Sequence, residues 1–121
     1  MSQYMLLLHE SPGGFTSLSP EEMQRVIEKY NAWSAKLASQ GKLAGGDKLR
    51  DEGGRHVRRD GKGGGRISVV DGPYTESKEI VGGYFKIEAA DYDDAVRVAR
   101  DCPHMDFGWI EIREIEPTQG P

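Results

Sequence analysis

The chain has 121 residues, of which 36% are hydrophobic and 30% are charged, a composition that fits one domain with a modest core and favours pairing with a second copy. Its net charge of −4 at pH 7 argues against a general attraction for nucleic acid or for an anionic membrane surface. Its one cysteine, Cys102, excludes an internal disulfide, and the apolar run Met5–Leu8 is too short for a signal peptide or a membrane span, so we expect a cytoplasmic protein.

The first predicted element is a strand from Tyr4 to His9. It is apolar on both of its alternating faces, which is typical of a central strand that is covered on each side. His9 ends this strand just before a loop that contains two consecutive glycines. A histidine in such a place can face a pocket, so His9 is a candidate ligand-binding residue, although a solvated or hydrogen-bonded bystander is the commoner role.

A helix is predicted from Ser19 to about Gln40. Ser19 can cap it, Pro20 suits the first helical position, and Glu22 completes a capping box. Apolar residues then recur at spacings of three and four along one side, namely Met23, Val26, Ile27, Tyr30, Trp33, Leu37 and Ala38. The two large aromatic members of this stripe either join the core, which is the commoner case, or line a ligand pocket.

The glycine-rich segment 42–66 is the least specified part of the chain. We predict two short strands in it, around Asp47–Arg50 and Arg55–Arg59, as a hairpin inserted before the strand that leads to Asp71. The segment contains eight Lys or Arg and four Asp or Glu, so its charge is about +4 while the remainder carries −8. This asymmetry can attract an anionic partner, but a solvated hairpin is the simpler interpretation.

The stretch Val69–Ile87 has the pattern of a strand, an ordered loop and a second strand. The first strand ends at Asp71, where Gly72-Pro73 turns the chain, so we expect the Asp71 carboxylate at the rim of a sheet. There it either lines a site or bonds to the backbone of its own loop. Two glycines open the second strand, which alternates between apolar and polar residues up to Ala89.

A second helix is predicted after Asp91, which can cap it, and it ends before Pro103. Its inner side is expected to hold Ala95, Val96, Ala99 and Cys102, so the cysteine is interpreted as a buried hydrophobe and not as a nucleophile. The last strand runs from Trp109 to Ile115. If both helices cover one face of the sheet, the other face carries Tyr84, Lys86, Glu88, Trp109, Glu111 and Arg113, and we expect this mixed face to pack against a second copy.

Three groups of residues together resemble a known family. Asp71-Gly72-Pro73-Tyr74 precedes Glu76, Lys78 and Glu79 and then Gly82-Gly83-Tyr84-Phe85, and the likeness extends to Tyr4–Leu8 at the start and to Cys102–Arg113 near the end. The chain thereby resembles the DGPF (YCII-related) family, with Tyr74 where that motif has Phe. The resemblance implies a ferredoxin-like α+β fold with a split βαβ arrangement, pairing of two chains into a dimeric α/β barrel, and an acid/base site built around His and Asp.

The catalytic pair that the sequence favours is His104 with Asp71. His104 lies between the second helix and the last strand, its imidazole titrates near neutrality, and a carboxylate on one ring nitrogen would fix its tautomer. The structural alternative is that His104 caps the carbonyls of the preceding helix. No spacing of metal ligands and no Gly-x-Ser-x-Gly turn occurs, so we predict no metal site, no serine triad and no cofactor.

Two further residues complete the predicted site. Tyr74 would orient a phenolic or carbonyl oxygen of a ligand, and Lys78 would neutralise an enolate or a carboxylate. The leading hypothesis is a lyase or isomerase that moves protons on a small molecule, aromatic or quinone-like, as a homodimer. The alternative is a non-catalytic module that binds a small ligand or has a regulatory partner.

Overall fold

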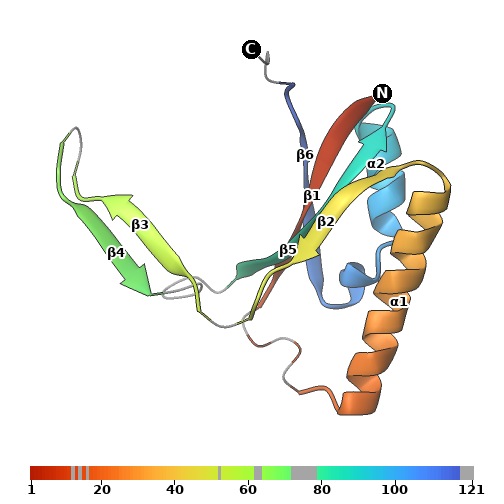
Figure 1. Cartoon of the computed structure of the whole chain (residues 1–121), viewed down its shortest axis with the longest axis horizontal. Coiled ribbons are helices and arrows are strands. Elements are labelled where there is room, and N and C mark those ends of the chain that lie inside the picture. Colours follow the sequence, from red (N-terminus) through yellow and green to blue (C-terminus); the bar gives the residue numbers. More distant parts are fainter. Residues whose placement is uncertain are drawn as a thin grey trace.

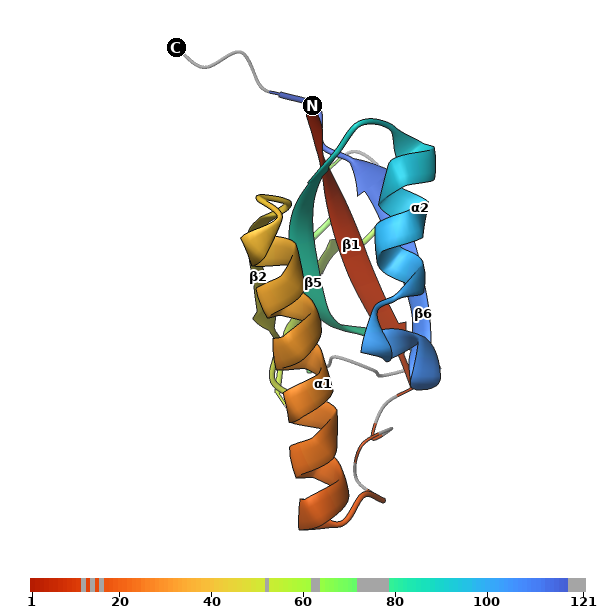
Figure 2. The same ribbon diagram turned by 90° about the vertical axis from the view of Figure 1, so that its right-hand side faces the viewer.

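The computed structural model describes residues 1–11, 13, 15, 17–51, 53–61, 64–71 and 79–117. It shows the mixed α+β class, with helices packed on one face of an antiparallel sheet (Figures 1 and 2). The elements in chain order are β1 (Ser2–Glu10), α1 (Pro20–Ser39), β2 (Leu43–Lys48), β3 (Arg55–Arg59), β4 (Ile67–Asp71), β5 (Ile80–Ala89), α2 (Tyr92–Arg100), the 3₁₀ helix η1 (Pro103–Asp106) and β6 (Gly108–Glu114).

The main sheet has four strands in the order β2-β5-β1-β6, and each neighbouring pair is antiparallel. Helix α1 connects β1 to β2, and α2 connects β5 to β6, so each helix joins two strands that are separated by one other strand. This is the split βαβ pattern. It places the ends of β1, β2 and β5 near one another beside α1, where the candidate site lies.

One strand of the main sheet differs from the prediction. The edge strand of the main sheet beside β5 is β2 (Leu43–Lys48), whereas the strand that ends at Asp71 pairs with β3 in a separate two-stranded sheet. The glycines of β2 explain how a segment without apolar alternation joins the main sheet, because a Cβ at Gly46 would lie 2.7 Å from the Phe85 ring. The apolar run that ends at Asp71 predicted a strand correctly, but such a run does not say which neighbour the strand pairs with.

Strands β3 and β4, here called the β3–β4 ribbon, stand apart from the main sheet. The ribbon extends away on the side of the sheet opposite to the helices, as the two views agree (Figures 1 and 2). Its register places Arg55 opposite Asp71 and Val57 opposite Val69. Strand β3 has the bounds that the sequence predicted for its second short strand.

Helix α1 begins as its sequence predicts. The Ser19 hydroxyl accepts a hydrogen bond from the Glu22 backbone N–H, and the Glu22 carboxylate accepts one from the Ser19 N–H. The predicted inward stripe is only partly correct, since Trp33 and Leu37 are buried while Ile27 and Ala38 are exposed. Ile27 lies in the N-terminal half of α1, which covers a cavity instead of the core, whereas Ala38 lies on the solvent side of the C-terminal half.

Helix α2 begins at the predicted cap, where the Asp91 side chain accepts a hydrogen bond from the Asp94 N–H. Its buried face holds Val98 in place of the predicted Val96, which is exposed. Cys102 is buried as predicted, and burial raises its pKa to about 11, so the thiol stays protonated near neutrality. Neither helix of the described residues has the length and apolar character that crossing a membrane requires.

Candidate functional site

A cavity of about 280 Å³ lies between the N-terminal half of α1 and the strands β1, β2 and β5. Its polar lining comes from Glu10, Tyr30, Asn31, Ser34, Asp47, Lys48 and His104. Its apolar lining comes from Leu8, Phe15, Met23, Val26, Ile27 and Phe85. An apolar cavity with a few convergent polar groups is the usual form of a small-molecule site.

The carboxylate of Glu10 is placed in this cavity by the alternation of β1. Leu6 and Leu8 face the helices, and Glu10 continues on the same side with 6% of its surface exposed. Gly82 makes the space for it, because a Cβ at that position would collide with Glu10 Oε1. Within the described residues no side chain or backbone group donates a hydrogen bond to Glu10, so its oxygens are open to the cavity.

Burial shifts the acidity of Glu10. Desolvation is the main cause that raises the pKa of Glu10 above its ordinary value of 4.5, and the charge of Lys48 partly opposes it. The Lys48 ammonium itself is held by Asp51, 2.9 Å away, and by the Leu49 carbonyl. Glu10 is therefore a carboxyl group that takes up a proton more readily than a solvated glutamate does, at the wall of a partly apolar cavity.

His104 and Tyr30 form the second polar feature of the cavity. His104 is 1% exposed, and its Nε2 lies 2.8 Å from the backbone oxygen of His9 while its Nδ1 lies 3.0 Å from the Tyr30 hydroxyl. A backbone oxygen can only accept, so in the neutral imidazole Nε2 carries the hydrogen and Nδ1 accepts from Tyr30. The close approach needs Gly108, where a Cβ would collide with the His9 oxygen and lie 3.0 Å from Nε2.

Burial fixes the protonation of this pair. It lowers the pKa of His104, and the hydrogen bond to the His9 carbonyl opposes that effect only in part. Burial also raises the pKa of Tyr30, so the phenol keeps its proton. Because that proton is directed at His104, the Tyr30 oxygen presents lone pairs to the cavity. His104 holds Tyr30 in place and Tyr30 accepts hydrogen bonds, so of these three groups Glu10 is the one able to take up and release a proton.

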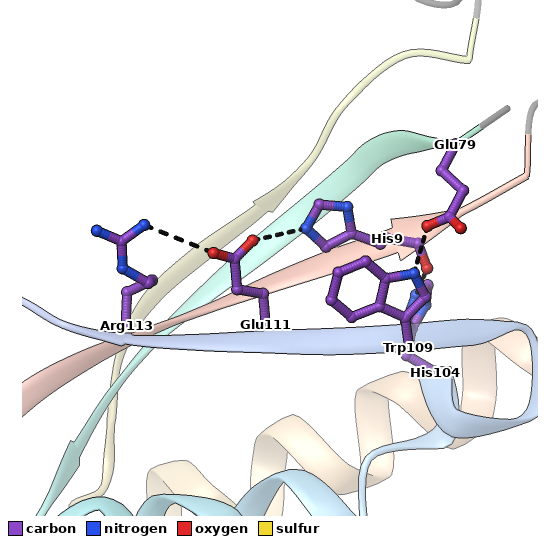
Figure 3. A network of polar contacts seen from close by, with 6 residues as sticks. All are labelled: His9, Glu79, His104, Trp109, Glu111 and Arg113. Atoms are coloured by element: carbon purple, nitrogen blue, oxygen red, sulfur yellow. Dashed lines mark hydrogen bonds and ion pairs between the residues drawn. The ribbon is translucent and has the colours of Figure 1, made fainter. Parts of the chain in front are cut away.

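A different polar cluster lies on the opposite side of the sheet (Figure 3). His9 Nε2 is 2.9 Å from Glu111 Oε1, and Arg113 lies 3.5 Å from the other oxygen of that carboxylate. The His9 ring stacks on Trp109 with centroids 4.1 Å apart, and the Trp109 indole N–H donates to Glu79. The hydrogen bond from His9 lowers the pKa of Glu111, so this cluster is an ion-paired network that holds a partly buried imidazole.

The predicted site residues are dispersed in the structure. Asp71 lies at the end of β4 with 89% of its side chain exposed, and it forms an ion pair with Arg55 at 3.1 Å. No hydrogen bond or ion pair joins it to His104 within the described part of the chain, because both ring nitrogens of His104 are already occupied. The separation follows from the pairing of β4 with β3 and not with the main sheet. Tyr74 and Lys78 lie outside the described residues.

His9 and His104, both singled out from the sequence, do come together. They are joined through the His9 backbone oxygen, and the His9 side chain points to the opposite face of the sheet from the cavity. Glu10 was missed by the sequence analysis. The signal was present, since a glutamate continuing the inward positions of Leu6 and Leu8 is a buried charge that needs an explanation. No group of three or more metal-ligating side chains occurs among the described residues.

Comparison with known proteins places this chain in a family. The YCII-related domain family matches residues 2–119. The chain belongs to the YCII-related family. A YCII-related relative in Rhizobium meliloti (strain 1021), the uncharacterized protein R00369, is 31% identical over 114 residues, which cover 93% of this chain and 90% of that protein. The resemblance recognised from the motifs is thus confirmed.

One solved structure resembles this YCII-related chain over its length. It is a 5-chloro-2-hydroxyhydroquinone dehydrochlorinase from Burkholderia phenoliruptrix AC1100, in complex with 2,5-dihydroxybenzoquinone. The two chains are 16% identical, the match covers 97% of this chain and 96% of that one, and the TM-score is 0.49. At this level of similarity the roles assigned to Glu10 and Tyr30 rest on their own geometry.

Proposed function

We propose that this YCII-related protein is a cofactor-independent proton-transfer enzyme, of lyase or isomerase type, whose active site is the cavity between α1 and the sheet. The observation that carries the proposal is Glu10, a buried carboxylate that takes no hydrogen bond from the described residues and opens onto an apolar cavity. A general base works best when its pKa is raised toward the operating pH and when it faces the proton that it removes.

The size and walls of the cavity support a small ring compound as the substrate. An engineered apolar cavity of about 150 Å³ in another protein holds benzene. The present cavity of about 280 Å³ therefore has room for one ring with substituents. Phe15 and Phe85 supply aromatic walls, and Met23 and Ile27 supply aliphatic ones. The substrate class is accordingly a single-ring aromatic or quinone-like molecule.

Hydrogen bonding assigns the remaining roles. Glu10 removes a proton from carbon or oxygen of the bound ring and returns it at another position, so no redox partner is needed. The Tyr30 oxygen accepts a hydrogen bond from a ring hydroxyl and orients the substrate, because its own proton is directed at His104. His104 is a positioning residue in this scheme. A role for Asp71 in the chemistry stays a prediction.

The oligomeric state is part of the same proposal. We infer that two copies pair through the sheet face opposite the helices and close a ferredoxin-like dimeric α/β barrel. This face carries Met5 and Leu7 between charged neighbours, together with Trp109, which is 45% exposed. Apolar and charged groups mixed on a sheet face are well suited to a symmetric contact in which cross-strand pairs satisfy the charges.

Deuterium exchange tests the proton transfer without knowledge of the natural reaction. The protein is incubated in D₂O with a panel of hydroquinones, substituted phenols and cyclic diketones, and loss of C–H signals is followed by ¹H NMR. We expect exchange of at least one compound, and a decrease of about 10²- to 10⁴-fold in Glu10→Gln, which is the usual contribution of a general base. The matched control is Glu28→Gln, a glutamate on the solvent side of α1. Equal rates in wild type and Glu10→Gln would refute the proposed base.

The second candidate function is a ligand-binding module without chemistry. It is favoured by the complete occupation of both His104 nitrogens, which removes the imidazole that the sequence proposed as the base. Under this alternative a ring compound binds in the cavity and shifts the NMR signals of Tyr30 and Phe85. It then shows no exchange above the rate in buffer at any pH, and Glu10→Gln changes affinity alone.

A further inference from the structure

The β3–β4 ribbon exposes a face that a folded protein rarely leaves in water. Because Val57 pairs with Val69 and Arg59 with Ile67, these side chains share one face of the ribbon. The three aliphatic side chains are 65%, 61% and 54% exposed, in the order Val57, Val69 and Ile67. Contiguous exposed apolar groups that are flanked by arginine are typical of a contact with another protein.

The stability of the ribbon requires such a contact. A two-stranded sheet without a layer packed on it is marginally stable at best in water. Within the described residues β3 and β4 pair with each other and with no strand of the main sheet. Exposed side-chain ties of the ribbon include the Arg55–Asp71 ion pair and hydrogen bonds from Arg59 and Ser68 to backbone carbonyls of the same hairpin. Exposed ion pairs contribute at most about 1 kcal/mol, so they do not replace an apolar layer.

The occupant that fits is a second copy of this chain. The ribbon extends on the side of the main sheet that lacks helices, so ribbon and open sheet face adjoin the same space (Figure 1). Charge is complementary as well, since the segment 42–66 carries +4, from eight basic and four acidic residues, and the remainder carries −8. The acidic remainder of a second copy therefore attracts the basic ribbon, whereas the open sheet face itself is balanced, with two basic and two acidic side chains. The exposed Trp109 on that face offers an apolar contact to the aliphatic side chains of the ribbon.

We propose that the ribbon face bearing Val57, Ile67 and Val69 packs on a second copy beside the contact between the two open sheet faces, each ribbon clasping the other chain across a two-fold axis. Arg55 and Arg59 lie on the same face of the ribbon and border this apolar contact. The inference rests on the proposed pairing of two copies, but not on the proposed proton transfer, because the cavity residues that are named above all come from one chain.

Adjacent residues of β4 provide a matched test. Val69 points to the proposed contact, and Ser68 points to the other face of the same strand, where it pairs with Arg58. Sedimentation velocity over a concentration series gives the dimer dissociation constant of wild type, Val69→Asp and Ser68→Asp, with circular dichroism as the check on folding. We expect Val69→Asp to weaken the dimer by about tenfold or more and Ser68→Asp to change it by less than about threefold. Equal effects of the two substitutions would overturn the proposal.

Cross-linking locates the contact without destabilising it. Cys102 is buried and its thiol is protonated, so a cysteine introduced on the ribbon is the reactive one. Val57→Cys is labelled with a maleimide photo-cross-linker and mixed with ¹⁵N-labelled chains. We expect cross-links between chains to peptides of β1 or β6, and far fewer from the control Arg58→Cys. Cross-links confined to one chain, or directed to α1, contradict the proposal, whereas the exchange assay judges the cavity separately.

Discussion

Replacing Glu10 with Gln is predicted to increase the stability of the protein at neutral and alkaline pH. The substitution keeps the size of the side chain and removes its charge. In the folded chain Glu10 is 6% exposed, and its carboxylate takes no hydrogen bond from the described residues, so burial disfavours its charged form. A residue retained for chemistry at the expense of stability is expected to behave in this way.

The pH at which the gain appears follows from the direction of the pKa shift. The folded pKa of Glu10 lies above its unfolded value of 4.5. The proton on Glu10 thus stabilises the folded state fully below pH 4.5, and this contribution is lost as the pH rises through the folded pKa. Wild type and Glu10→Gln should therefore be similar in acid and diverge at higher pH, by on the order of 1 kcal/mol.

Urea denaturation at a series of pH values from 4 to 8 measures this difference, and calorimetry gives a second reading. For a domain of this length each 1 kcal/mol corresponds to roughly 3 to 6 °C in Tm. Glu28→Gln serves as the control, because its carboxylate is exposed on α1. A difference that stays constant with pH, or a Glu10→Gln protein that is less stable than wild type at pH 8, would refute the structural reasoning.

Three other predictions concern groups near the site. Glu111→Gln should show the opposite pH dependence to Glu10→Gln. The hydrogen bond from His9 lowers the pKa of Glu111, so the Glu111 carboxylate stabilises the fold above pH 4.5, and this stabilisation is lost as the pH falls through the folded pKa. Parallel curves for the two variants in urea denaturation would contradict this prediction. Burial lowers the pKa of His104 below 6.5. Acidification through this folded pKa should therefore destabilise wild type relative to His104→Gln. Thermal melts in which wild type and His104→Gln respond equally to acid would contradict the prediction. Gly108→Ala should lower the free energy of unfolding by about 1 to 3 kcal/mol, because its Cβ collides with the His9 backbone oxygen, and an unchanged Tm would argue against that close approach.

Local signals in the sequence predicted the elements well. The capping box at Ser19 and the cap at Asp91 fixed both helix starts, because each depends on contacts within one turn. The alternation of apolar and polar residues in β5 predicted which side of that strand faces the core, and the family motifs predicted the class of fold. The sequence did not predict which sheet the strand ending at Asp71 joins, because its pairing depends on contacts distant in sequence. It also did not predict the bounds of β2, because the glycines of that strand interrupt the apolar pattern typical of a strand.

The candidate site was harder to predict for a related reason. His104 was singled out from the sequence, and in the structure its ring nitrogens bond to Tyr30 and to the His9 backbone oxygen instead of to Asp71. A backbone partner leaves no trace in the sequence. Glu10 could have been found from the inward positions of β1, and Gly82 is its counterpart on β5, where the absence of a side chain makes room for the carboxylate.

The acidity of Glu10 in the folded protein is the quantity on which the account depends most. It can be measured directly by ¹³C NMR, from the side-chain carboxyl signal of Glu10 followed through a pH titration, with Glu28 as the internal reference and Glu10→Gln for assignment. We expect a titration midpoint above 4.5 for Glu10, and a further change when a ring compound occupies the cavity. A midpoint at or below 4.5 that no ring compound alters would contradict this expectation.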